Sequence, residues 1–306
     1  MSTLKIMSKK KDQTTKSIDY EIKYFEFESS YKKNIKLSLC KLQIETRDPG
    51  EFSRVLLFVP EIGVSYKNYF EYMKTLLSEH VVDEIITFDH YGSGVSGGVR
   101  GFNIDSENYI SDMQKAYQIA MNELKEARLI VFGHGFGATL SLISESEGLL
   151  GKVSGLIIKD PFLGSDRFRN ITKKISQAIS SKKIKSYINI KSYTGKRFFP
   201  TVKDQSEFDR LCINTQYQNL DFLETFSQLS KSVIERSYLT EKPILFFHSG
   251  NLAMKSSGEL LKLYQKGVGE NIVTSIELDK SGYFENFSFP ARGDIEKVRS
   301  WVESFN

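Results

Sequence analysis

The sequence has no long hydrophobic run. None of its apolar stretches approaches the roughly 18 residues that a membrane-spanning helix needs, although 40% of the 306 residues are hydrophobic. The N-terminal stretch MSTLKIMSKKKDQTTKS contains lysines but lacks the apolar segment of a secretory signal. We therefore expect a cytoplasmic globular protein whose residues 1–18 form a short, disordered basic tail.

Cysteine and histidine are also scarce. The two cysteines, Cys40 and Cys212, lie too far apart in the sequence to suggest a disulfide framework or a zinc site. Only four histidines are available as catalytic bases or metal ligands. The low cysteine content argues against a disulfide-rich secreted protein, and the sequence predicts no metal and no cofactor.

The net charge of +4 is too small by itself to indicate a nucleic-acid partner, but the charge is unevenly distributed. The segment from Ser165 to Lys203 holds eleven lysine and arginine residues and one acid, Asp166, so it carries +10. Because the whole chain carries +4, the remainder carries −6. A basic block therefore lies within an otherwise mildly acidic protein.

Hydrophobic periodicity predicts an α/β fold. Residues 20–28 and 35–45 alternate as two antiparallel strands, after which short apolar strands alternate with helices. These strands are expected at 54–59, 84–88, 129–132, 153–158, 244–248 and 272–278, and the helices at 66–79, 107–126, 136–146, 257–267 and 292–304. Repeated strand–helix units predict a mostly parallel sheet with helices on both faces.

One segment of this pattern lacks the residue that its context predicts. Residues 128–142, RLIVFGHGFGATLSL, read as a buried strand, a tight turn of small residues and a helix. That is the context of the nucleophile elbow, Gly-x-Ser-x-Gly, which presents a catalytic serine. Here Gly135 occupies the serine position. Without the serine the turn cannot form an acyl-enzyme.

Several further segments resemble the monoacylglycerol lipase, lysophospholipase and serine aminopeptidase-like branch of the α/β-hydrolases. The loop FDHYGSGVSGGVRGF at 88–102 is similar to the Asp-x-x-Gly-x-Gly-x-Ser loop of that branch. Three other matches are the oxyanion-hole loop at 60–69, the strand before the catalytic acid at 243–250 and the loop of the catalytic histidine at 281–285. The resemblance implies an α/β-hydrolase core over 19–160 and 241–306, with residues 161–240 inserted as a lid.

This sequence departs from the family pattern at the positions of the catalytic residues. Gly135 occupies the position of the serine and Phe284 that of the histidine. By direct alignment, Ala253 occupies the position of the acid. The His-Gly of the oxyanion-hole loop has become Pro60-Glu61, where a carboxylate would repel a developing oxyanion. A serine hydrolase needs a nucleophile, a base and an orienting acid, so the resemblance implies a pseudoenzyme with a degenerate triad.

The four histidines are candidates to replace the missing base. We expect His90, in the glycine-rich loop, and His134, in the elbow, to be structural, and His80, at the end of an exposed helix, to be solvated. His248, which ends the strand at 244–248, is the one expected to face the mouth of the site. The serines and Asp89 of the glycine-rich loop are expected to hydrogen-bond within it.

The predicted ligand-binding residues come from the loops around the former active site. They are Glu61, Ile62, His134, Gly135, Phe136, His248, Tyr283 and Phe284. The leading hypothesis is a catalytically inactive protein that binds a lipid-like or small acyl ligand, or a protein partner, at this place. The alternative is an active esterase or lysophospholipase with a non-standard site.

The basic block supports a second hypothesis. Isoleucines 171, 175 and 179 recur at helical spacing among lysines 173, 174, 182 and 183. A basic amphipathic segment of this kind can lie on an anionic membrane surface, which would make the protein peripherally membrane-bound. The alternative is a lid whose isoleucines pack on the body and whose lysines are solvated. No nucleic-acid-binding module is recognised, so no such partner is expected.

Overall fold

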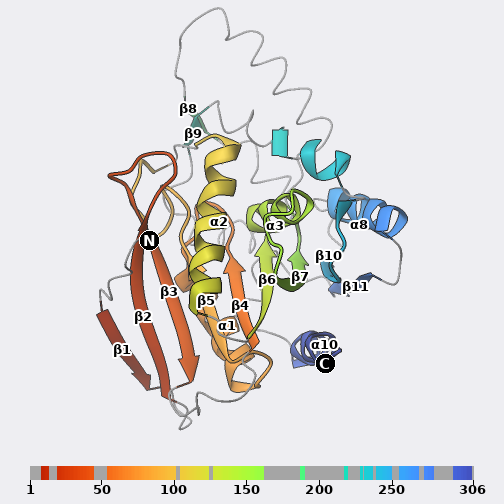
Figure 1. Cartoon of the computed structure of the whole chain (residues 1–306), viewed down its shortest axis with the longest axis horizontal. Coiled ribbons are helices and arrows are strands. Elements are labelled where there is room, and N and C mark those ends of the chain that lie inside the picture. The colour runs from red at the N-terminus through yellow and green to blue at the C-terminus, as the bar shows by residue number, and fades with distance from the viewer. Residues whose placement is uncertain are drawn as a thin grey trace, which may run out of the picture.

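The computed structural model shows one central sheet with helices on both faces (Figure 1). It describes residues 8–13, 19–44, 54–100, 104–123, 127–161, 187–189, 217–219, 228–229, 231–236, 239–249, 255–268, 272–278 and 292–304. Within these residues the predicted α/β architecture is confirmed.

The sheet has nine strands in the order β1-β2-β3-β5-β4-β6-β7-β10-β11. Its strands are β1 Ser8–Gln13, β2 Asp19–Glu28, β3 Lys36–Ile44, β4 Arg54–Val59, β5 Glu84–Phe88, β6 Arg128–His134, β7 Val153–Lys159, β10 Ile244–Ser249 and β11 Val273–Leu278. The pairs β1–β2, β2–β3 and β3–β5 are antiparallel, and every later pair is parallel. The predicted antiparallel start and parallel continuation are therefore confirmed.

The first strand corrects the expectation of a disordered tail for residues 8–13 of the predicted range 1–18. Residues 8–13, SKKKDQ, pair with β2 along its free edge. The physical reason is that an edge strand exposes a row of unpaired backbone N–H and C=O groups, which a neighbouring segment can satisfy.

The helices lie where the periodicity predicts them. They are α1 Phe70–Ser78, α2 Ser106–Glu123, α3 Phe136–Ser146, α8 Lys255–Val268 and α10 Arg292–Glu303. One difference is local: the predicted helix over 66–79 begins as a 3-10 turn, η1, at Tyr66–Tyr69. The Ser65 hydroxyl accepts a hydrogen bond from the Lys67 N–H at its start, which satisfies one of the free donors of the turn.

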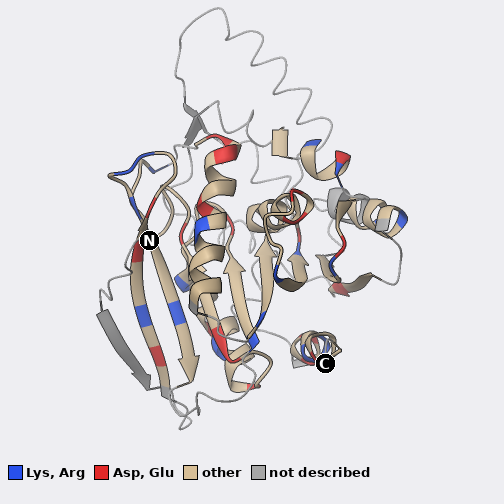
Figure 2. Cartoon of the chain, viewed as in Figure 1, with Lys and Arg blue, Asp and Glu red and all other residues tan. Residues whose placement is uncertain are grey.

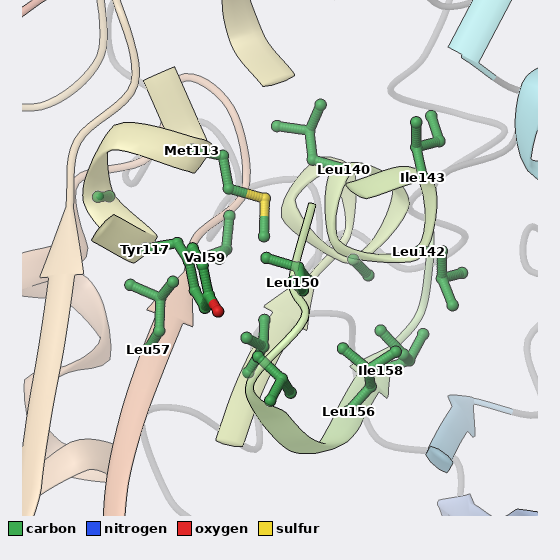
Figure 3. Close-up of a cluster of buried hydrophobic side chains, with 14 of the residues drawn as sticks. Leu57, Val59, Met113, Tyr117, Leu140, Leu142, Ile143, Leu150, Leu156 and Ile158 are labelled. Atoms are coloured by element: carbon green, nitrogen blue, oxygen red, sulfur yellow. The ribbon is translucent and has the colours of Figure 1, made fainter. Parts of the chain in front are cut away.

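Alternate side chains along the strands pack into two hydrophobic cores. The first core lies under α2, α3 and α8, and the second lies under α1 and α10. In the first core, Met113 and Tyr117 of α2 and Leu140 of α3 gather with Leu57 and Val59 of β4 (Figure 3). The ends of the parallel strands that carry the elbow are thus held between packed layers.

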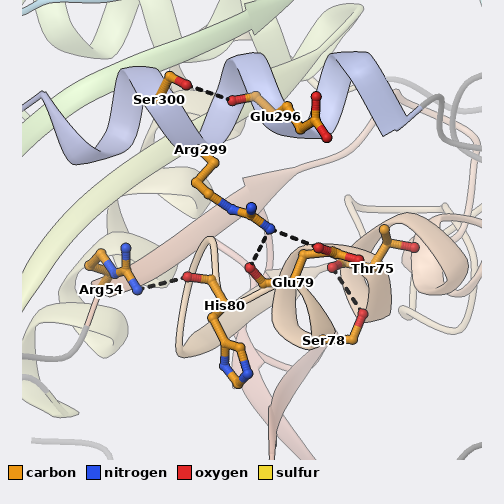
Figure 4. Close-up of polar contacts among 8 residues, drawn as sticks. All are labelled: Arg54, Thr75, Ser78, Glu79, His80, Glu296, Arg299 and Ser300. Atoms are coloured by element: carbon orange, nitrogen blue, oxygen red, sulfur yellow. Dashed lines mark hydrogen bonds and ion pairs between the residues drawn. The ribbon is translucent and has the colours of Figure 1, made fainter.

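Polar contacts dock the C-terminal helix on the second face (Figure 4). The guanidinium of Arg299 donates to the Glu79 carbonyl at 2.8 Å and to the Glu79 carboxylate at 2.7 Å. Arg54 donates to the carbonyl of His80 at 2.7 Å. The imidazole of His80 is exposed, which confirms the expectation that this histidine is solvated.

Strands β7 and β10 are neighbours in the sheet although more than 80 residues separate them in sequence. Within this intervening segment, β8 Tyr187–Asn189 and β9 Tyr217–Asn219 pair as a separate antiparallel ladder. Leu229 and Val233 reach back into the first core. The isoleucines and lysines of residues 171–183 lie outside the part of the chain that the structure describes. Among the described helices, none combines the length and the apolar character needed to cross a membrane.

Candidate functional site

The turn between β6 and α3 has the geometry predicted for a nucleophile elbow. Gly135 has φ 56° and ψ −114° and stands directly before the first residue of α3. Its N–H donates to the carbonyl of Lys159 at 3.0 Å, and its carbonyl accepts from the N–H of Thr139 at 3.2 Å. Glycine adopts a positive φ without the steric cost that a Cβ imposes.

Two flanking glycines allow α3 to pack directly on the sheet backbone. A Cβ on Gly133 would lie 2.5 Å from the Cα of Ala138. A Cβ on Gly137 would lie 2.1 Å from the carbonyl oxygen of Val59. The elbow therefore needs small residues at both positions for packing, whether or not a nucleophile stands between them.

Replacing Gly135 with serine should lower the free energy of unfolding by about 1–2 kcal/mol, because a side chain would have to adopt a strained backbone. Urea denaturation of the wild-type protein and the variant measures this difference. An unchanged or raised midpoint in the variant would show that the backbone at position 135 is not strained.

The carboxylate of Glu61 lies at this elbow and bridges two backbone amides. One oxygen accepts from the N–H of Ile62 at 2.7 Å, and the other accepts from the N–H of Phe136 at 3.2 Å. In α/β-hydrolases the oxyanion hole is formed by the N–H after the nucleophile and by one from the loop after an early strand. Phe136 follows Gly135, and Ile62 lies in the loop after β4. The side chain of Glu61 is only 7% exposed.

Hydrogen bonds from two sides fix the backbone of the loop after β4. The hydroxyl of Tyr69 accepts from the N–H of Glu61 at 3.2 Å, so its own proton is available for Nδ1 of His134 at 3.0 Å. The hydroxyl of Ser93 accepts from the N–H of Gly63 at 2.8 Å. The imidazole of His134 is fully buried against Tyr69. It therefore supports the loop from within the protein, as its structural interpretation predicts.

His90 supports the same loop from the glycine-rich segment. Its Nε2 lies 2.9 Å from the carbonyl oxygen of Pro60 and donates to it. The ring packs edge-on against Phe88, Tyr109 and Phe136. Burial lowers the pKa of His90 to about 4, so the imidazole is neutral near pH 7. The predicted structural role of His90 is confirmed.

Asp89 organises the glycine-rich loop, as predicted. Its carboxylate accepts from the N–H groups of Tyr66 at 2.6 Å and Val95 at 2.7 Å, and from the hydroxyl of Ser65 at 3.2 Å. Burial raises the pKa of Asp89 to about 7, against the effect of these donors. A Cβ on Gly94 would lie 1.9 Å from the carboxylate, so the loop wraps tightly around this one side chain.

The structure brings together only part of the predicted ligand-binding set. Glu61, Ile62, Gly135 and Phe136 meet at the elbow, where Phe136 contributes its N–H while its ring is fully buried. His248 is half-buried at the end of β10, two strands from β6. Ala253, Tyr283 and Phe284 fall in segments that the structure does not describe.

Sequence reasoning missed a buried ion pair beside the elbow. Lys159, the last residue of β7, pairs through its ammonium group with the carboxylate of Asp160 at 2.8 Å, and both residues are buried. The same Lys159 carbonyl accepts from Gly135. The sequence signal for this pair is two adjacent opposite charges at the end of an apolar strand. Charges buried at such a place must be paired.

No group of three or more histidine, cysteine, aspartate and glutamate side chains among the described residues could hold a metal ion. The polar side chains around the elbow bind backbone groups of neighbouring loops. This arrangement can position two N–H donors accurately, but position 135 itself contributes no side chain that could react.

Solved structures share this fold across almost the whole chain. A carboxyl esterase from Bacillus coagulans in complex with glycerol has 13% identity and a TM-score of 0.71, covering 93% of this chain and 98% of that one. A monoglyceride lipase from Saccharomyces cerevisiae in complex with a substrate analogue has 12% identity and a TM-score of 0.63, covering 100% and 97%. At such low identity the likeness shows the fold alone. No curated protein matches the sequence.

The family model identifies the family of the chain, whereas the structural likeness shows only its fold. The family model described as serine aminopeptidase, S33, matches residues 50–269. This range contains the elbow, the loop after β4 and the glycine-rich loop. The predicted resemblance to lipase-like and esterase-like α/β-hydrolases is thereby confirmed at the level of the family and the fold, and the chain belongs to the serine aminopeptidase S33 family of α/β-hydrolases.

Proposed function

We propose that this protein is a non-catalytic member of its family, which uses the former active site to bind a lipid-like or small acyl molecule. The observation that carries the proposal is Gly135 at the elbow. Its backbone keeps the geometry that presents a nucleophile, while the residue itself has no group that can attack a carbonyl.

The surroundings of the elbow support the same proposal. Two nearby serines are engaged with the loops: Ser93 with the N–H of Gly63, and Ser96 with the carbonyl of Asp89 at 2.6 Å. His90, which contacts the oxyanion-hole loop from the glycine-rich segment, is buried and neutral. Within the part of the chain that the structure describes, neither serine is paired with a base, which a serine nucleophile needs for activation.

The choice of ligand class rests on the relatives. The structurally similar monoglyceride lipase was solved with a substrate analogue, and its fold matches this chain throughout. By analogy with that protein, we infer that the ligand contains an acyl chain or has a similar shape. A protein partner that inserts an apolar side chain is the other occupant consistent with this site.

The experiment that tests the proposal measures hydrolysis by the pure protein. We expect no turnover of p-nitrophenyl butyrate or monooleoylglycerol above background, and no labelling by a fluorophosphonate probe. The Gly135→Ser variant should remain inactive as well, because the position of the family's histidine carries Phe284, which cannot activate the new hydroxyl as a base. Saturable hydrolysis by the wild-type protein would instead establish the alternative, an active esterase with a non-standard site.

We also propose that the basic block from Ser165 to Lys203 contacts anionic lipid. Charges of both signs are interspersed over α2 and the neighbouring strands (Figure 2), whereas this block holds eleven basic residues against one acid. Each basic residue near an anionic surface contributes about 1 kcal/mol, and salt screens the attraction.

Liposome flotation tests this contact. Binding to phosphatidylglycerol vesicles should exceed binding to phosphatidylcholine vesicles and should fall as salt rises. Reversing the charges of Lys173, Lys174, Lys182 and Lys183 to glutamate should abolish the difference. Equal flotation with both kinds of vesicle would remove the membrane from the proposal and leave the ligand site unaffected.

A further inference from the structure

We propose that Glu61 is a built-in anion that occupies the oxyanion-binding site and closes it to carbonyl and anionic ligands. The proposal goes beyond loss of the nucleophile, because it names the group that fills the site and the class of ligand that the site excludes. A ligand of the former active site would then be held without the two N–H groups that bind an acyl oxygen in active relatives.

The two donors that meet the carboxylate come from different parts of the chain. Ile62 lies in the loop after β4, and Phe136 opens α3. Their N–H groups converge on the two oxygens of one side chain, at 2.7 Å and 3.2 Å. This is the arrangement in which an oxyanion hole binds its anion, with an internal carboxylate in the place of the reacting group.

Electrostatics favour the carboxylate at this place. The N-terminus of a helix carries a partial positive charge and binds anions through its free N–H groups, and α3 is 11 residues long. Burying a carboxylate costs free energy unless it is hydrogen-bonded, and Glu61 is only 7% exposed. Charge-assisted hydrogen bonds to two amides compensate for that burial.

The backbone of the loop holds the carboxylate in place. The carbonyl before Glu61 is bound by His90, the N–H of Glu61 itself by Tyr69, and the N–H of Gly63 by Ser93. A group fixed next to its binding site competes at a high effective concentration, in the millimolar range or above. An external carboxylate or carbonyl would have to displace Glu61 from the two N–H groups.

The test uses butyrate as a small carboxylate probe and follows the backbone amide signals of Ile62 and Phe136 by NMR on protein labelled at isoleucine and phenylalanine. In the wild-type protein, butyrate should leave both signals unchanged. In Glu61→Gly, both signals should shift in a saturable manner, with a dissociation constant at least about tenfold below any wild-type value. Butyrate should also raise the melting temperature of this variant and not that of the wild-type protein.

Glu61→Gln is the graded variant, because its side chain has the same size but no charge and only one acceptor oxygen. It can satisfy only one of the two N–H groups, so butyrate should bind it more tightly than the wild-type protein and more weakly than Glu61→Gly. If Glu61→Gly does not fold, Glu61→Ala provides the same opening with a stiffer backbone.

Two results would overturn the proposal. One is a saturable response of both amides in the wild-type protein, and the other is an absence of response in a folded Gly or Ala variant. Neither depends on ester hydrolysis, so this test and the activity test can fail separately.

Discussion

Replacing Gly137 with alanine should destabilise the protein by about 3 kcal/mol, near the upper end of what overpacking a protein interior usually costs. The added methyl group would lie 2.1 Å from the carbonyl oxygen of Val59 and 2.6 Å from that of Pro60. Both atoms belong to the backbone at the end of β4, so no side chain can rotate away. Helix α3 would have to move off the sheet and take the N–H of Phe136 with it.

Chemical denaturation of the variant measures this loss. Gly151→Ala is the matched control, because a Cβ at position 151 would meet nothing within 4 Å, and exposed substitutions usually change stability by less than about 0.5 kcal/mol. A Gly137→Ala variant as stable as this control would mean that α3 does not pack on the backbone of β4. The predicted effect is a large part of the about 5–15 kcal/mol that stabilises a typical domain.

The second large effect should appear on acidification. Burial lowers the pKa of His90 from its ordinary value of 6.5 to about 4. Between these two values the unfolded chain binds a proton that the folded protein excludes, so folding stability falls as the pH is lowered through this range. The difference of two to three pKa units corresponds to about 3 kcal/mol. Below pH 4 this histidine should cause no further loss.

Other groups also titrate in this range, so the prediction concerns a difference between two proteins. Glutamine in place of His90 can still donate to the carbonyl of Pro60 but does not titrate. We expect the stability of the wild-type protein to fall by about 3 kcal/mol more than that of His90→Gln between pH 7 and pH 4. Parallel stability profiles measured by urea denaturation would show that His90 is not buried in its neutral form.

Both predictions concern residues that the family chemistry does not require. Gly137 and His90 hold the loop after β4 against the elbow, and this arrangement is retained although Gly135 offers no nucleophile. The loop after β4 and the elbow thus keep two N–H donors, and both donate to the carboxylate of Glu61.

Much of the fold follows from local sequence patterns. The apolar run of β4, RVLLFV, and the spacing of apolar residues in α2 are local signals, so the strand–helix alternation and the predicted insertion point could be recognised without tertiary structure. Gly135 in the elbow was visible because the turn depends on small residues at fixed positions. The first strand was not visible, since SKKKDQ is polar and forms β1 only because β2 offers it a free edge.

The sequence by itself determined that Gly135 occupies the predicted nucleophile position and that Glu61 lies in the loop predicted to form the oxyanion hole. It predicted that Glu61 would repel an oxyanion, but only the tertiary structure decided that this carboxylate binds both donors. The reason is that Ile62 and Phe136 belong to segments about 70 residues apart, joined by the parallel pairing of β4 with β6. Local patterns fix strands and turns, whereas the direction of a side chain between two loops depends on long-range packing.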